Sequence, residues 1–75
     1  MIWIKINHTG GSVYLNLEQV YRFEQTSSTE ITFYDANSIL PTSYTFSTAA
    51  DLSRFLAKLV SISKVIDIDQ LAVQG

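Results

Sequence analysis

Apolar residues occupy every second position in two runs near the start of the chain, and this feature constrains the fold most. In an extended chain, alternate side chains point to opposite faces, so each run predicts a strand with one buried face. Between the runs, residues 9–12 (Thr-Gly-Gly-Ser) supply a turn, because glycine reaches positive φ at little steric cost. Residues 2–17 therefore predict a β-hairpin. Its alternating apolar residues are Ile2, Ile4, Ile6, Val13, Leu15 and Leu17.

Three further strands are predicted before any helix. Their sequences are rich in β-branched and aromatic side chains, which favour strands. Polar residues 26–29 predict a turn, and residues 35–41 predict a loop, in which Pro41 has no amide hydrogen to donate to a ladder. Short connections favour antiparallel pairing, so we expect one antiparallel sheet of about four to five strands over residues 2–47. The three added strands are expected at residues 20–25, 30–36 and 42–47.

One amphipathic helix is predicted over residues 49–61. Thr48, with Asp51 three residues later, resembles a capping box, and a carboxylate in the first turn suits the helix dipole. The apolar positions that follow have the i, i+3, i+4, i+7, i+8 spacing of one buried stripe. The sequence therefore predicts an α+β fold in which one C-terminal helix packs across the sheet. The stripe consists of Leu52, Phe55, Leu56, Leu59 and Val60.

An apolar tail over residues 62–73 follows the predicted helix. Either it forms a last strand or the helix continues into it, and an extended segment is the preferred interpretation. Such a tail would cover the sheet edge of its own chain or pack on a neighbour. A domain of 75 residues buries only about 60% of its unfolded surface, so association is a reasonable source of stability. We therefore predict a homodimer, with candidate contacts at Ile62, Val65, Ile66 and Ile68.

The composition limits both chemistry and partners. The chain has no cysteine, and its single histidine, His8, lies beside a glycine turn with no catalytic partner near it in the sequence. Five basic residues are scattered among seven acidic ones, which disfavours binding to a nucleic-acid backbone. No apolar stretch approaches the roughly 18 residues of a membrane span. We expect a single domain over residues 1–75 that is not an enzyme, uses no metal or cofactor, does not enter a membrane and resides in the cytoplasm.

Five aromatic residues on the predicted strands are the candidate contact surface. If several shared an exposed face, they would form a stacking platform for bases or for a peptide. The simpler interpretation is that they pack under the helix or at a dimer interface, because no basic residues interleave with them in the sequence. These residues are Trp3, Tyr14, Tyr21, Tyr34 and Tyr44.

The order of segments, together with the stretch Val13-Tyr14-Leu15-Asn16-Leu17-Glu18-Gln19-Val20, resembles small bacterial proteins of the flagellar-operon FlbD type. Those proteins carry a strand, a glycine turn, a strand ending near an asparagine, two more strands and a short helix. The resemblance covers roughly residues 2–60, and the chain departs from it in the loop at 35–41 and in the apolar tail. The chain is more loosely similar to Whirly-type single-stranded-DNA-binding domains, which also place a helix after an antiparallel sheet. Neither resemblance implies a catalytic residue.

The function predicted from the sequence is a small, non-enzymatic interaction module that self-associates. A separate protein partner is also compatible with the apolar tail. The alternative is a single-stranded nucleic-acid-binding protein that uses the aromatic residues of the sheet. A third alternative is an enzyme that acts only together with a partner.

Overall fold

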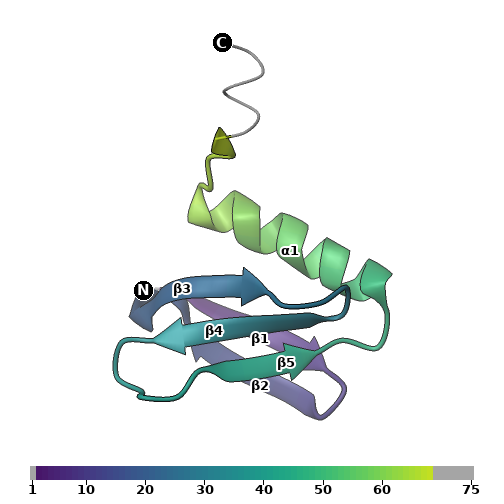
Figure 1. Ribbon diagram of the computed structural model, residues 1–75, viewed down its shortest axis with the longest axis horizontal. Helices are drawn as coiled ribbons and strands as arrows, with labels where there is room; N and C mark the ends of the chain where they lie inside the picture. Colours follow the sequence, from purple (N-terminus) through teal and green to yellow (C-terminus); the bar gives the residue numbers. More distant parts are fainter. Residues whose placement is uncertain (1, 69–75) are drawn as a thin grey trace.

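Within residues 2–68, five strands precede one long helix, in the order that the sequence predicts (Figure 1). The structure is a computed structural model, and it describes residues 2–68. The α+β fold class and the antiparallel pairing are confirmed. The strands are divided, however, between a two-stranded sheet and a three-stranded sheet instead of forming one sheet. In Figure 1 the two sheets lie one behind the other, and the helix lies along one side of the pair, next to β3.

The first sheet is the predicted hairpin. It consists of β1 (Trp3–His8) and β2 (Gly11–Asn16), which pair antiparallel. Its register places Ile4 opposite Leu15 and Ile6 opposite Val13, so the alternating apolar residues share one face. Gly11 has a φ of 130°, a backbone conformation that residues with a Cβ rarely adopt. The glycine after the turn is therefore required by the backbone of the hairpin.

The second sheet has β4 at its centre. Strand β3 (Val20–Gln25) pairs on one side of β4 (Glu30–Asp35), and β5 (Thr42–Thr45) pairs on the other. A single turn of 3-10 helix, η1 (Leu17–Gln19), connects the two sheets. The central strand is buried on both faces, because Ile31 and Phe33 point into the core while Thr32 is covered by its neighbours. The Thr32 hydroxyl is satisfied there by a 2.7 Å hydrogen bond with the hydroxyl of Ser43.

The core joins both sheets to the helix. The two sheets meet at the ends of β1 and β5, where the Thr9 amide donates a 2.9 Å hydrogen bond to the Thr45 carbonyl. Leu52 and Leu59, on the predicted stripe of the helix, are buried among residues from both sheets. The helix therefore packs on the sheets through the stripe that the sequence indicates. The buried apolar core consists of Ile6, Ile31, Phe33, Phe46, Leu52 and Leu59.

The helix, α1 (Ala49–Ser63), ends two residues beyond its predicted end. Ile62 therefore belongs to the helix and not to the tail. Lys64 ends the helix in the left-handed conformation, with φ 56° and ψ 46°, and its amide donates to carbonyls of the last turn. Residues 65–67 have no regular secondary structure and Ile68 is helical, so the described part of the tail contains no strand. Residues 69–73 of the predicted tail lie outside the described residues.

We expect Lys64→Gly to raise the free energy of unfolding by about 0.5–1 kcal/mol. A left-handed residue with a Cβ costs roughly 1–2 kcal/mol, and glycine removes that cost while its greater freedom in the unfolded chain takes back part of the gain. Urea denaturation measures the change. The control is Ser53→Gly, at an exposed position inside the helix, where glycine should be destabilising by about 0.5–1 kcal/mol. Destabilisation by both variants would contradict this account of the helix end.

Candidate functional site

Trp3 and Tyr14 lie on the outer face of the first hairpin. Lys5 pairs with Tyr14 across the strands, and its Nζ atom lies 5.9 Å from the centre of the Tyr14 ring. Trp3 is on the same face because it is two residues from Lys5 along β1. Both aromatic side chains are exposed. The structure thus places one basic residue, Lys5, beside two of the five predicted contact residues.

The other three aromatic residues lie on the second sheet. The rings of Tyr21 and Tyr34 are 6.2 Å apart, and the Arg22 guanidinium lies 4.7 Å from the centre of the Tyr34 ring. Tyr44 instead faces inward, with its ring 6.0 Å from Phe33. Tyr21 is exposed, whereas Tyr34 and Tyr44 are partly buried. The five residues are therefore spread over separate places, and they do not form one stacking platform.

His8 contacts both the glycine turn and a tyrosine of the second sheet. Its Nδ1 atom accepts a 3.1 Å hydrogen bond from the Gly10 amide, and its ring packs 5.0 Å from that of Tyr44. The bond links the end of β1 to the glycine turn. His8 is thus the partly buried last residue of β1, close to the glycine turn.

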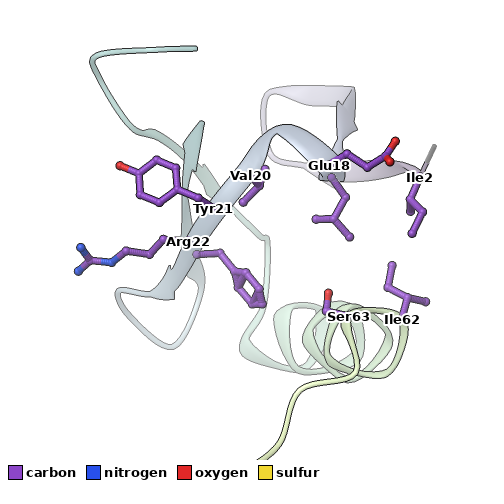
Figure 2. Close-up of a pocket in the computed structure, with 9 residues that line it drawn as sticks. Ile2, Glu18, Val20, Tyr21, Arg22, Ile62 and Ser63 are labelled. Carbon is purple, nitrogen blue, oxygen red and sulfur yellow. The ribbon is translucent and has the colours of Figure 1, made fainter. Parts of the chain in front are cut away.

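Exposed apolar side chains gather along the end of the chain. Ile62 lies in the last turn of α1, and Val65, Ile66 and Ile68 follow it. All four are exposed, and Ile66 and Ile68 expose 67% and 69% of their surface. Ile2, at the start of the described chain, faces Ile62 across a groove (Figure 2). We call these five residues, Ile2, Ile62, Val65, Ile66 and Ile68, the C-terminal apolar set.

The groove beside Ile2 and Ile62 is the η1–α1 groove, with a volume of about 390 Å³. Leu17, Val20 and Phe23 contribute apolar side chains to it. Figure 2 shows the Ile2 and Ile62 side chains pointing toward one another, while Tyr21 and Arg22 point away from the helix. Arg22 forms an ion pair with Glu24, so its charge is already matched. The η1–α1 groove therefore offers apolar surface without unmatched positive charge.

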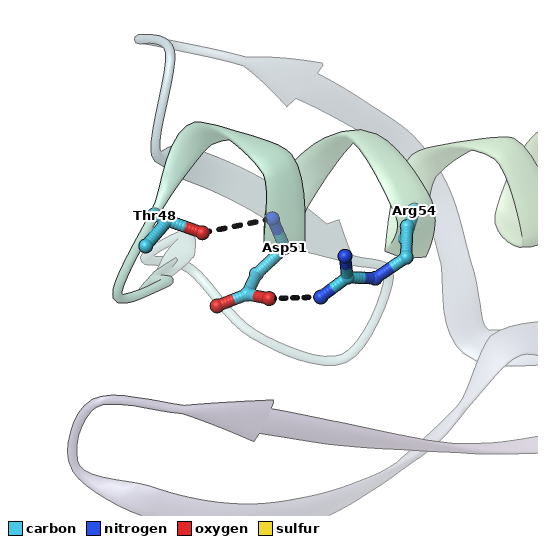
Figure 3. Close-up of polar contacts among 3 residues, drawn as sticks. All are labelled: Thr48, Asp51 and Arg54. Carbon is cyan, nitrogen blue, oxygen red and sulfur yellow. Dashed lines mark hydrogen bonds and ion pairs between the residues drawn. The ribbon is translucent and has the colours of Figure 1, made fainter.

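The start of α1 fixes the polar side chains of a second groove. The Thr48 hydroxyl accepts a 3.1 Å hydrogen bond from the Asp51 amide, as expected for an N-cap (Figure 3). The Asp51 carboxylate in turn pairs with the Arg54 guanidinium one turn later. This cap confirms the predicted start of the helix. The ion pair with Asp51 holds the Arg54 side chain along the first turns of α1.

The second groove lies between β1 and α1, and we call it the β1–α1 groove. It has a polar half of about 500 Å³ and an apolar half of about 200 Å³, which share Lys5, Phe55 and Lys58. Arg54 and His8 line the polar half, and Asp51 is its one carboxylate. Further lining residues of the apolar half are Ile4, Leu59 and Ile62.

Three of the five basic residues thus line one groove, a grouping that the sequence analysis missed. Arg54 and Lys58 are four positions apart on the helix, so helical spacing alone could have placed those two on one face. Lys5 is more than forty residues away in sequence, and only the packing of α1 beside β1 brings it to the groove. The scattered charges of the sequence become a local positive region.

Within residues 2–68, no group of three or more histidine, cysteine, aspartate or glutamate side chains is placed to hold a metal ion. Over the same residues, no helix combines the length and the apolar character needed to cross a membrane. Comparison with known proteins finds no matching family model, no matching curated sequence and no matching solved structure. The resemblances to FlbD-type and Whirly-type proteins therefore stay predictions from the sequence.

Proposed function

We propose that this chain is a small, non-enzymatic interaction module that self-associates through the C-terminal apolar set. The observation that carries the proposal is the amount of apolar surface left outside the core. Among the described residues, ten large apolar side chains are exposed and only six are buried in the core. Exposed apolar side chains that cluster are typical of interaction sites, whereas single ones are ordinary. Half of the ten belong to the C-terminal apolar set.

Self-association suits the small size of the domain. Burial of apolar surface between two copies adds to the stability that a six-residue core supplies. A symmetric dimer also uses every contact twice, so a short apolar segment contributes twice its own burial. The chain has no disulfide that could supply this stability instead, since it contains no cysteine.

Single-stranded nucleic-acid binding has weaker support. Binding of this kind combines aromatic stacking with a positively charged groove along the backbone. Here the aromatic residues lie in separate places, and the chain carries a formal net charge of −2. Quenching of Trp3 fluorescence by a single-stranded oligonucleotide, with loss of the quenching at higher salt, would favour this alternative.

Replacement of Ile66 and Ile68 by aspartate together should convert the dimer to a monomer. Each isoleucine removed from an interface costs about 1.5–3 kcal/mol, and each occurs twice in a symmetric dimer, so the dissociation constant should rise by at least about a hundredfold. Sedimentation equilibrium over a range of concentrations measures the constant. The melting temperature of the unaltered protein should also rise with concentration, as it does for a dimer.

The matched control replaces Ile39 and Leu40 by aspartate, with the same change in charge. These side chains lie in the loop before β5 and are 99% and 74% exposed, so their replacement should leave the dissociation constant within about threefold. A protein that stays monomeric at high micromolar concentration would overturn the proposal. So would a dimer that survives replacement of Ile66 and Ile68.

A further inference from the structure

The β1–α1 groove brings apolar side chains and positive charge together, because its two halves share Lys5, Phe55 and Lys58. Ile4, Leu59 and Phe55 provide apolar walls in one half, and Lys5 and Lys58 line both halves. The second half adds Arg54. A ligand that fills the groove would therefore bury apolar side chains and present negative charge to the lysines.

The charge of the groove is unusual for this chain. Lys5, Arg54 and Lys58 line it with the single carboxylate of Asp51, which pairs with Arg54, while the Lys5 Nζ atom lies 5.9 Å from the Tyr14 ring. Lys58 forms no ion pair within the described part of the chain. The rest of the sequence has two basic and six acidic residues. A long polyanion would be repelled by that surrounding surface, so the groove suits a short segment with one or two negative charges.

The chain itself contains such a segment. Residues 65–68 read Val-Ile-Asp-Ile, and Asp69 follows in the sequence. In the single chain residues 65–67 have no regular secondary structure and Ile68 is helical; once the segment is extended, Ile66 and Ile68 lie on one side and Asp67 on the other. Ile66 and Ile68 are exposed in the single chain. The segment therefore has both properties that the groove requires, namely apolar side chains on one side and a carboxylate on the other.

A second copy supplies this segment more readily than the same chain does. Ile62 lines the groove and lies only four residues before Ile66. After the helix ends at Lys64, the chain runs away from the sheets (Figure 1). The η1–α1 groove is a weaker receptor for an acidic segment, because Arg22, the basic residue in its lining, already pairs with Glu24.

We propose that residues 65–68 of each copy occupy the β1–α1 groove of the other, with Ile66 and Ile68 in its apolar half and Asp67 beside Lys58. This inference depends on the proposed self-association and names the surface that receives residues 65–68 of the C-terminal apolar set. The exchange is reciprocal, so every contact occurs twice in the dimer.

Reversal of one charge tests the pairing. Lys58→Glu should weaken the dimer by about tenfold, because it places a carboxylate opposite Asp67 at both symmetric sites. Asp67→Lys should weaken it to a similar extent. The combined variant, K58E with D67K, restores opposite charges and should return the dissociation constant to within about threefold of the original. Sedimentation equilibrium measures all three, and circular dichroism checks that each variant is folded.

Arg22→Glu is the control, because it makes the same change in net charge outside the groove. It should leave the constant within about threefold. If the unaltered protein is monomeric, the proposed function fails together with this inference. If the protein is a dimer but Lys58→Glu has no effect, or weakens it no more than Arg22→Glu does, self-association stands and the groove is not its site. Failure of the combined variant to restore the dimer would also overturn the pairing.

Discussion

Replacement of Leu59 by alanine should lower the free energy of unfolding by about 2–5 kcal/mol. Leu59 is 1% exposed and belongs to the core that joins the helix to both sheets. The loss combines the transfer of its side chain to water with the cavity left among neighbours that relax only in part. A domain of this size has a total stability of roughly 4–11 kcal/mol, so the variant should lose a large part of it. Urea denaturation, followed by circular dichroism at a fixed protein concentration, measures the change.

The matched control is Leu40→Ala, which removes the same atoms from an exposed position in the loop before β5. Its unfolding free energy should stay within about 0.5 kcal/mol of the original. Equal effects at the two positions would contradict the burial of Leu59 beneath the helix. The fold would then not depend on the apolar stripe.

Phe33→Ala should be at least as destabilising, by about 3–5 kcal/mol. Phe33 is 2% exposed at the centre of β4, and its ring lies 6.1 Å from that of Phe23 and 6.0 Å from that of Tyr44. Aromatic pairs at such distances add roughly 0.5–1.5 kcal/mol to the burial of their surface. The variant therefore loses its contacts with both neighbouring strands at once. Thermal unfolding should show a lower melting temperature and a broader transition.

Tyr14→Ala is the comparison for an aromatic residue that points away from the core. Tyr14 is 64% exposed, and its ring contact is with the flexible side chain of Lys5. Its replacement should cost no more than about 1 kcal/mol. A larger loss than that of Phe33→Ala would show that the outer face of the hairpin carries stability that the core does not explain.

Local patterns were sufficient to predict the strands and the helix. The alternation of Ile4 and Ile6 with polar neighbours specifies which face of β1 is buried, because the side-chain period of a strand is two. The spacing of Leu52 and Leu59 does the same for the helix, with its period of 3.6. Thr48 fixed the start of the helix through a hydrogen bond to a residue only three positions away. Each of these features acts over a few residues, so the sequence displays it directly.

The end of the helix was less predictable. Ser61 and Ser63 lie between the apolar residues of the last turn, and no glycine marks the stop. The helix ends instead at Lys64, in a conformation that lysine rarely adopts. A stop that depends on an unfavourable backbone conformation leaves no compositional signal.

Some of the exposed residues could likewise be predicted from the sequence, and others could not. The exposed apolar residues of the tail could be singled out from the sequence, since Ile66 and Ile68 follow the stripe of the predicted helix. The placement of the tyrosines could not, because Tyr21 and Tyr44 have similar strand contexts and only one of them points into the core. The positive groove needed Lys5 and Lys58 to meet from opposite ends of the chain.

The sequence by itself determined which segments are strands and which is a helix, and which side of each is apolar, because neighbouring residues along the chain set those properties. Only the tertiary structure decided that the strands divide into two sheets, which tyrosines remain in water and that three basic residues share a groove. These outcomes depend on contacts between residues far apart in the sequence. A contact of that kind is chosen by the packing of the whole core, and no short segment specifies it.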